Sequence, residues 1–375
     1  MNVNNNSVKR KDDLTDYYDA CVTGKAVVLR GDGEPRIASN TIRALQELKP
    51  SFLDEDSYSV GGEVEKLEKR FSEMLGKESA IFMPTGTLAN HIAIRKLCGV
   101  KQKVIVQQQS HLYNDCGDSV TRLSGISLLP LGFNETCFTI KELTEAVSHI
   151  EKSRVATQIG ALMIESPVRR KFGQVVSFDQ MQDISQFCLD RGYSTHLDGA
   201  RLFMMSGSSG FSVQKYCDLF DTVYVSLYKY FGAPFGAILA GSNNLLEDLH
   251  HERRMFGGSL PSSYLSAALS LRGVEGFESR FVDAMKHASK LLDSLDTLKH
   301  ISIKRFENGS NMFPVELDKS VDVDIFVLSL RRKSIFIYPD DDNSEKFTIT
   351  VNTTILRQPH SEIFENFRQA LLDAS

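Results

Sequence analysis

The sequence lacks the features that mark membrane proteins and nucleic-acid-binding proteins. No uninterrupted apolar stretch approaches the roughly 20 residues that span a bilayer. No run of lysines and arginines offers a basic face, and the formal net charge of the 375 residues is −5. We therefore expect neither a nucleic-acid partner nor a membrane partner. Trp is also absent, which decides nothing about function.

The cysteines do not follow a spacing that is typical of metal sites or disulfide scaffolds. The six cysteines contain no C-x-x-C pair and no zinc-ligand spacing, so we predict no metal site. In a chain of this length six scattered cysteines do not form a disulfide scaffold, which favours reduced thiols and a cytoplasmic location. The first residues are polar and lack the apolar core of a secretory signal, so residues 1–28 are expected to be a polar tail or arm.

The remaining composition, 42% hydrophobic and 24% charged, is that of a globular protein with a large core. From residue 29 to residue 258, short apolar strands alternate with helical patterns. Val64, Leu67, Phe71 and Leu75 recur at helical spacing, and Ser79–Met83 follows as a buried strand. Such alternation predicts an α/β domain with a mostly parallel sheet covered on both faces.

Other segments continue this pattern. Further strands are expected over 104–106, 161–164, 194–197, 222–227 and 236–240, with helices over 88–97, 140–150 and 178–190. After about Gly257 the pattern changes to long helical stretches, 262–271 and 278–295, followed by short strands. Residues 259–375 are therefore predicted to form a smaller α+β domain.

Polar residues follow two of the predicted strands, where open parallel sheets bind their ligands. Asp198 ends an apolar strand, and Arg201 comes three residues later. An ordinary helix N-cap with a partner arginine would explain the pair equally well. Lys229 closes another apolar strand, where loss of solvation would lower its pKa and make the amine nucleophilic. A surface lysine that extends its amine to solvent is the alternative.

A third polar strand end is Pro84-Thr85-Gly86-Thr87, between a strand and a helix. Backbone N–H groups at a helix N-terminus bind anions such as phosphate, although Thr85 could simply cap the helix. A phosphate cradle, a carboxylate and a lysine are together the parts that a pyridoxal phosphate (PLP) enzyme needs.

Three segments resemble the low-specificity threonine aldolases and their β-eliminating-lyase relatives: Phe82–Asn90, His196–Phe203 and Val223–Lys229. Asp56–Val64 and Arg253–Gly258 are similar as well. These are PLP-dependent enzymes of fold type I, the aspartate-aminotransferase fold. The resemblance implies PLP as cofactor, a small amino acid as substrate, and a homodimer or homotetramer.

The resemblance also implies roles for individual residues. Lys229 would hold the cofactor as a Schiff base, and Asp198 would pair with the pyridine nitrogen. His111 would stack on the cofactor ring and is the candidate base, although a loop histidine is the alternative. Other residues are expected to contact the cofactor: Thr85, Gly86, Thr87, Arg201 and Ser226.

The sequence departs from the commonest aldolases near the expected substrate site. Gly31 stands where they have a serine, in Arg30-Gly31-Asp32, and Val168 stands where they have a second histidine. Their C-terminal substrate arginine is missing from Phe347–Val351. We predict Arg169 as the substitute, because an arginine fork matches a carboxylate with two hydrogen bonds. Its rivals are Arg170 and Arg357, and Tyr58 is also expected near the substrate.

The predicted reaction is retro-aldol cleavage of a threonine-like β-hydroxy-α-amino acid to glycine and an aldehyde. β-Elimination or racemisation of a related amino acid uses the same cofactor chemistry and is the first alternative. A non-catalytic subunit that keeps the PLP fold is the second, and intact Asp198, Lys229 and Thr87 argue against it.

Overall fold

The computed structural model describes residues 15–48, 53–155, 157–340 and 343–375. The chain divides into two compact units. Of the described residues, unit 1 contains those within 1–47, 276–307 and 311–375, and unit 2 contains those within 48–275 and 308–310. These limits differ from the boundaries expected after residues 28 and 258, and much of the expected N-terminal arm, residues 1–14, lies outside the described residues.

Pairing between distant segments accounts for the different boundaries. Strand β1 (Val27–Val28) runs parallel to β11 (Ile335–Phe336), and the Leu29 carbonyl accepts a 3.0 Å hydrogen bond from Thr350 N. The N-terminal segment therefore belongs with the C-terminal third. Helix α13 (Tyr264–Val274) packs against α3 (Gly62–Leu75), which keeps it in unit 2. A two-residue strand is too short to show any periodicity in the sequence.

Unit 2 is built on a seven-stranded sheet in the order β2-β8-β7-β6-β5-β3-β4. Its strands are β2 (Ser79–Met83), β3 (Lys103–Gln107), β4 (Ser127–Leu131), β5 (Ile159–Glu165), β6 (Ser194–Asp198), β7 (Thr222–Ser226) and β8 (Ala237–Gly241). Only β8 is antiparallel to its neighbours, so the predicted mostly parallel sheet is confirmed. Strand β4 was not expected, because Pro130 interrupts it; proline is tolerated there since β4 is an edge strand.

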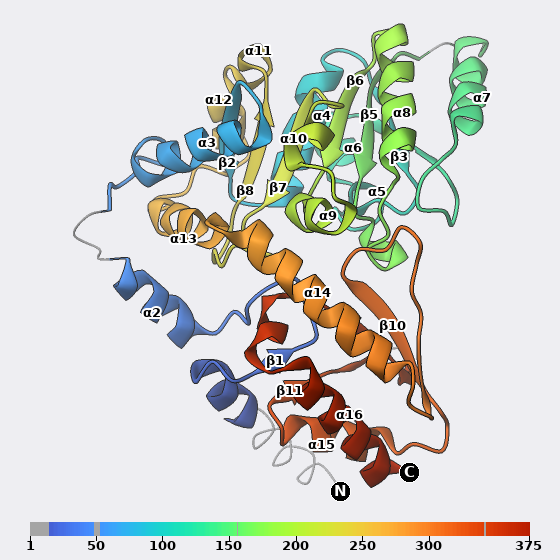
Figure 1. The fold of residues 1–375 in the computed structure, drawn as a ribbon. Coiled ribbons are helices and arrows are strands. Elements are labelled where there is room, and N and C mark those ends of the chain that lie inside the picture. The colour runs from blue at the N-terminus through green and yellow to red at the C-terminus, as the bar shows by residue number, and fades with distance from the viewer. Residues whose placement is uncertain (1–14, 49–52, 156, 341–342) are drawn as a thin grey trace, which may run out of the picture. The chain divides into compact units, whose positions relative to one another are not determined.

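Helices cover both faces of this sheet (Figure 1). Helix α4 (Gly86–Cys98) packs on one face, where Ile92 meets Ile81 of β2 and Leu239 of β8. Helix α3 packs on the other face, where Phe71 contacts the rings of Phe203 and Phe231. The other helices of unit 2 are α5 (His111–Asn114), α6 (Ser119–Ser124), α7 (Ile140–Glu151), α8 (Phe178–Arg191), α9 (Leu202–Ser209), α10 (Val213–Cys217), α11 (Asn243–Leu246), α12 (Leu249–Met255) and the 3-10 turn η2 (Arg169–Lys171).

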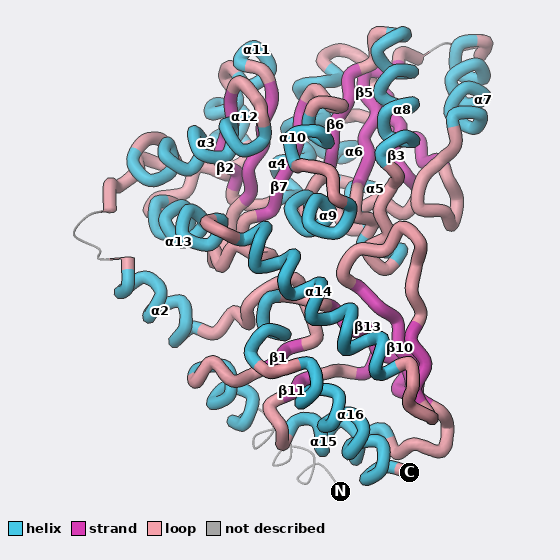
Figure 2. The backbone as a smooth tube through the Cα atoms, in the orientation of Figure 1, coloured by secondary structure: helices cyan, strands magenta, loops and turns pink. Residues whose placement is uncertain are grey.

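Unit 1 is the expected α+β structure, and Figure 2 shows its strands beside its helices. Its main sheet has the order β12-β13-β10-β9 and is antiparallel. The elements not yet named are α2 (Ala38–Glu47), α14 (Phe277–Leu295), β9 (Ile301–Ile303), β10 (Met312–Leu317), α15 (Val323–Arg331), β12 (Pro339–Asp340), β13 (Asn343–Thr350), η3 (Thr353–Arg357) and α16 (His360–Ala374). Among the helices that the structure describes, none combines the length and apolar composition that a bilayer crossing requires.

Arg253 of α12 anchors the turn that leads into α4. Its side chain is wholly buried and donates to the carbonyls of Phe82 (2.6 Å) and Ser59 (2.9 Å). The backbone N–H of Phe82 donates to Glu68 Oε1 at 2.7 Å, and burial raises the pKa of Glu68 to about 7. Both backbone groups of Phe82 are therefore held immediately before Pro84–Thr87.

Replacing Arg253 with Ala should lower the free energy of unfolding by about 3 kcal/mol or more, because buried carbonyls lose a charged donor. Arg254→Ala is the matched control: Arg254 is exposed and contacts the Tyr58 ring at 5.5 Å, so its loss should cost less than about 1 kcal/mol. Urea unfolding of the two variants measures the difference. Equal effects would contradict the anchoring role.

Candidate functional site

The candidate site begins with three polar side chains that are aligned across neighbouring strands, two of them at carboxyl ends. The strand register aligns Glu165 of β5 with Asp198 of β6, and Asp198 with Tyr224 of β7. All three are buried. Burial first, and then the charge of Asp198, raises the pKa of Glu165 well above its usual range. Burial also raises the pKa of Tyr224, so its phenol stays protonated at neutral pH.

Asp198 is held by a chain of buried hydrogen bonds. Asn90 Nδ2 of α4 donates to Asp198 Oδ2 at 2.6 Å, and Ala200 N donates to Oδ1 at 3.2 Å. His196 Nε2 lies 2.9 Å from Asn90 Oδ1, and His196 Nδ1 lies 2.8 Å from Thr222 Oγ1. Asp198 does not cap α9, whose N-cap is Arg201. The Asp198 carboxylate instead accepts hydrogen bonds within this network.

The hydrogen bonds determine the tautomer of His196. Because the Asn90 amide donates to Asp198, its oxygen must accept, and His196 Nε2 therefore carries the proton. Nδ1 then accepts from the Thr222 hydroxyl. Burial lowers the pKa of His196 to about 4, so the imidazole is neutral at physiological pH.

The segment Thr85-Gly86-Thr87 forms the N-terminus of α4. Thr85 caps the helix, with its hydroxyl accepting from Leu88 N at 3.1 Å, so the capping alternative for Thr85 is confirmed. Gly86 has no space for a side chain, since a Cβ there would lie 1.9 Å from the Tyr224 hydroxyl oxygen. The helix N-terminus thus packs closely against the Tyr224 side chain of β7, and its first backbone N–H groups have no acceptor within the helix.

Ser226 is the last residue of β7, and Lys229 lies three residues after it. Lys229 is half-buried, and its charge acts on His111, as do those of Asp198 and Arg169. Ser226 Oγ is buried near the Tyr224 phenol but makes no hydrogen bond of ordinary geometry to any described residue. The buried Ser226 hydroxyl and the N-terminal N–H groups of α4, which begins at a position without space for a side chain, both fit a phosphorylated cofactor beside Lys229.

His111 is the first residue of α5 and is half-buried. Burial lowers its pKa, so the ring is neutral at pH 7. Its Nδ1 lies 3.2 Å from Cys116 Sγ, and Cys116 also contacts the Thr87 hydroxyl. Burial raises the pKa of Cys116 to about 12, which keeps it a thiol. The thiol thus links His111 to the N-terminus of α4.

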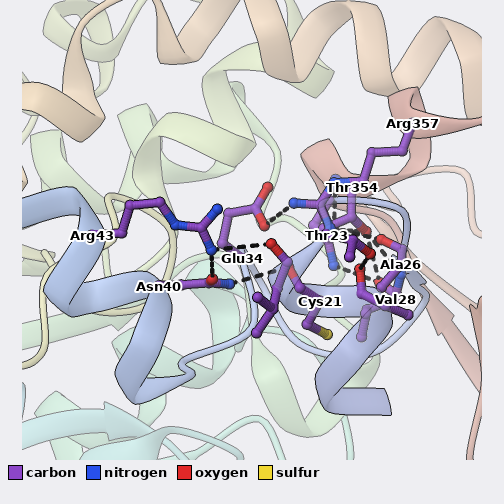
Figure 3. A network of polar contacts seen from close by, with 12 residues as sticks. Cys21, Thr23, Ala26, Val28, Glu34, Asn40, Arg43, Thr354 and Arg357 are labelled. Atoms are coloured by element: carbon purple, nitrogen blue, oxygen red, sulfur yellow. Dashed lines mark hydrogen bonds and ion pairs between the residues drawn. The ribbon is translucent and has the colours of Figure 1, made fainter. Parts of the chain in front are cut away.

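The three candidate arginines differ in what they contact. Arg357 of unit 1 pairs with Glu34 and donates to the Ala26 carbonyl at 2.7 Å (Figure 3). Arg170 forms a two-pronged ion pair with Asp115, at 2.6 and 3.2 Å. Arg169 is exposed, and its guanidinium makes no hydrogen bond or ion pair among the described residues.

Two expected substrate residues, Gly31 and Tyr58, have contacts within their own surroundings. Gly31 belongs to unit 1, where its carbonyl accepts from Asn352 Nδ2 at 3.0 Å. Tyr58 is 54% exposed and lies against Arg254; within the described part of the chain, no hydrogen bond joins it to Asp198 or His111. Arg201 is buried, and its charge acts on Glu165.

The structure brings into the site several residues that were not predicted to have a role there: Asn90, Gln107, Cys116, Glu165 and His196. His196 was detectable, because residues two apart on a strand share a face and His196 precedes Asp198 by two. Asn90 and Gln107 carried no such signal, since their contacts are with segments distant in sequence.

The pKa of His196 predicts how stability depends on pH. An unfolded histidine titrates near 6.5 and the folded one near 4, so its contribution is complete above pH 6.5 and is lost as the pH falls toward 4. Between pH 7.5 and 4.5 the free energy of unfolding should fall by about 2–3 kcal/mol more in the wild type than in His196→Gln. Urea unfolding at both pH values measures this, and parallel losses would contradict a buried neutral imidazole.

Several known proteins with similar sequences or structures are threonine aldolases, and one is an alanine racemase. The chain is 25% identical over 269 residues to the low-specificity L-threonine aldolase of Candida albicans, covering 71% of this chain and 67% of that enzyme. It is 26% identical over 309 residues to the alanine racemase TOXG of Cochliobolus carbonum, covering 80% and 76%. A crystal structure of a candidate L-allo-threonine aldolase from Listeria monocytogenes superposes with a TM-score of 0.78 at 27% identity, covering 95% and 99%.

The structural likeness confirms the predicted fold, fold type I of the PLP-dependent enzymes. The family model described as "Beta-eliminating lyase" matches residues 38–318, which is most of the chain and includes the whole Asp198 network. The protein is therefore a member of the β-eliminating lyase family.

Proposed function

We propose that this protein is a PLP-dependent lyase that cleaves a threonine-like β-hydroxy-α-amino acid to glycine and an aldehyde. The observation that carries the proposal is that the charges of Lys229 and Asp198 both act on His111, which Cys116 links to the N-terminus of α4. The names of the Candida and Listeria relatives support the same reaction. When bound, PLP supplies an aldehyde that condenses with amines and a ring that accepts the electron pair of the broken bond.

The chain's own residues would bind and orient the cofactor. Lys229 provides the amine. The N–H groups at Gly86 and Thr87, with the hydroxyl of Ser226, would bind the phosphate. Asp198 would keep a proton on the ring nitrogen, because the Asn90 amide holds the carboxylate in place and leaves its remaining lone pairs available. Arg201 would lie beside the phenolic oxygen of the cofactor.

His111 would take the proton of the β-hydroxyl group. Its lowered pKa keeps the ring neutral, as a base requires. In this role Nδ1–H donates to Cys116 Sγ, which leaves the lone pair of Nε2 for the substrate. Arg169 would bind the substrate carboxylate, with Tyr58 and Gly31 as further substrate contacts. Among the described residues the Arg169 guanidinium has no hydrogen-bond or ion-pair partner, whereas those of Arg170 and Arg357 are paired, and this supports the choice of Arg169.

Racemisation or β-elimination is the second candidate, supported by the likeness to the alanine racemase TOXG. Product analysis with threonine, allo-threonine, serine and alanine separates the reactions. Glycine and acetaldehyde support the lyase. Pyruvate and ammonia indicate β-elimination, and a D-amino acid indicates racemisation.

We also propose a cytoplasmic homodimer or homotetramer. The six free cysteines, all buried, support a reducing compartment. The oligomer is proposed from the family resemblance, and size-exclusion chromatography with light scattering measures it directly.

Lys229→Ala should remove the cofactor linkage and reduce activity to background, because the nucleophilic amine is lost. Borohydride reduction of the PLP-loaded protein, followed by mass spectrometry, should find a pyridoxyl adduct on Lys229 in the wild type and none in the variant. Lys215→Ala is the control, since Lys215 is an exposed lysine that packs over Phe178 and Phe211. A wild-type protein without this adduct would overturn the proposal.

Arg169→Ala should raise KM for the amino acid by about tenfold to a hundredfold with a smaller change in kcat, because a charged hydrogen-bonded pair contributes about 1.5–3 kcal/mol. Arg170→Ala should change KM less than about threefold, since Arg170 already pairs with Asp115 at the surface. Steady-state kinetics of both variants make the comparison. The reverse order would assign the carboxylate to Arg170.

A further inference from the structure

Glu165 holds two site segments with one carboxylate. Its Oε2 accepts from the backbone N–H of His111, at the start of α5, and its Oε1 accepts from the backbone N–H of Arg169 at 3.0 Å, at the start of η2. The side chain is buried. The two residues proposed to take the β-hydroxyl proton and to bind the substrate carboxylate are therefore attached to the same group.

The position of that carboxylate is fixed by Gln107. The backbone pairing between β3 and β5 ends at Val106 and Met163. Beyond this point, the Gln107 side chain makes the hydrogen bonds to the β5 backbone. Its Oε1 accepts from Glu165 N at 2.6 Å, and its Nε2 donates to Glu165 O at 3.0 Å. The same Nε2 donates to the Thr136 carbonyl at 2.8 Å. Glu165 is thus held from both backbone groups and through both carboxylate oxygens.

A second link between the same segments is weaker. The Arg170–Asp115 ion pair also joins η2 to the end of α5, but the Arg170 side chain is 43% exposed and that of Asp115 is 24% exposed. Ion pairs in contact with solvent contribute little, whereas hydrogen bonds to a buried carboxylate are strong and directional. Glu165 is therefore the rigid connection.

We propose that Glu165 is a positioning residue that sets the spacing between the His111 imidazole and the Arg169 guanidinium. This inference rests on the proposed function, because the spacing matters only if both residues engage one substrate. A bound amino acid would then have its carboxylate and its β-hydroxyl group placed by a single buried side chain, and a small displacement of reacting groups lowers rates strongly.

Two substitutions test the proposal in graded steps. Glu165→Gln keeps one acceptor oxygen, so one of the two N–H groups loses its partner. Glu165→Met has similar length and volume but no acceptor of comparable strength, so both lose it. Glu135→Gln is the control, because Glu135 is exposed, precedes the Thr136 carbonyl that Gln107 contacts, and makes no side-chain hydrogen bond or ion pair among the described residues.

Hydrogen exchange of the protein without added cofactor reads the positioning directly. In Glu165→Met the exchange rate should rise at least about tenfold in both segment 109–115 and segment 168–173. In Glu165→Gln it should rise in one of these segments, and in Glu135→Gln in neither. Kinetics should show kcat/KM about tenfold lower in Glu165→Gln and lower still in Glu165→Met, with KM raised and kcat reduced, whereas Arg169→Ala acts mainly on KM.

The outcomes separate this inference from the proposed function. Wild-type exchange and wild-type kcat/KM in both Glu165 variants would overturn the positioning role, and so would a rise in exchange throughout the sheet. If Glu165→Met does not fold, the exchange and the kinetics of Glu165→Gln still test the positioning role. A wild-type protein with no adduct on Lys229 and no product would refute the proposed function, while the exchange data would still report whether Glu165 orders the two segments.

Discussion

Two carboxylates that are shielded from water lie side by side at the carboxyl ends of β5 and β6, and the rest of the site depends on them. A buried charge is unfavourable unless donors surround it. Asp198 accepts hydrogen bonds from the Asn90 amide and the Ala200 N–H, and Glu165 accepts them from the N–H groups of two loops. Segments that follow different strands are therefore held together at the carboxyl ends of β5 and β6.

The two carboxylates differ in what they can do. Asp198 is linked through Asn90 to a neutral imidazole, so the network orients the group without adding a second charge. Among the described residues, the Glu165 carboxylate accepts from the backbone N–H groups of His111 and Arg169, which favours a role in holding loops. One carboxylate is thus suited to a ligand and the other to the architecture around it.

Much of the fold could be predicted because its elements are periodic or end in clear signals. The strands from β2 to β8 that carry continuous apolar runs, and helices such as α8, lie within a few residues of their expected limits. The exceptions have physical reasons: Pro130 hides an edge strand, and the two-residue β1 gains its strand pairing from β11, which lies about 300 residues away. For the same reason the unit boundaries differ from those expected.

The residue types of the candidate site follow from the sequence alone: a carboxylate and a lysine after buried strands, and a Thr-Gly-Thr turn at a helix N-terminus. They are visible because each belongs to a local pattern. The tertiary structure decided which arginines are already paired, what holds Asp198, and that Glu165 and Gln107 join loops that are far apart in the chain. Hydrogen bonds between distant segments leave no periodicity in a sequence, and only the packed strands bring their donors and acceptors within 3 Å of one another.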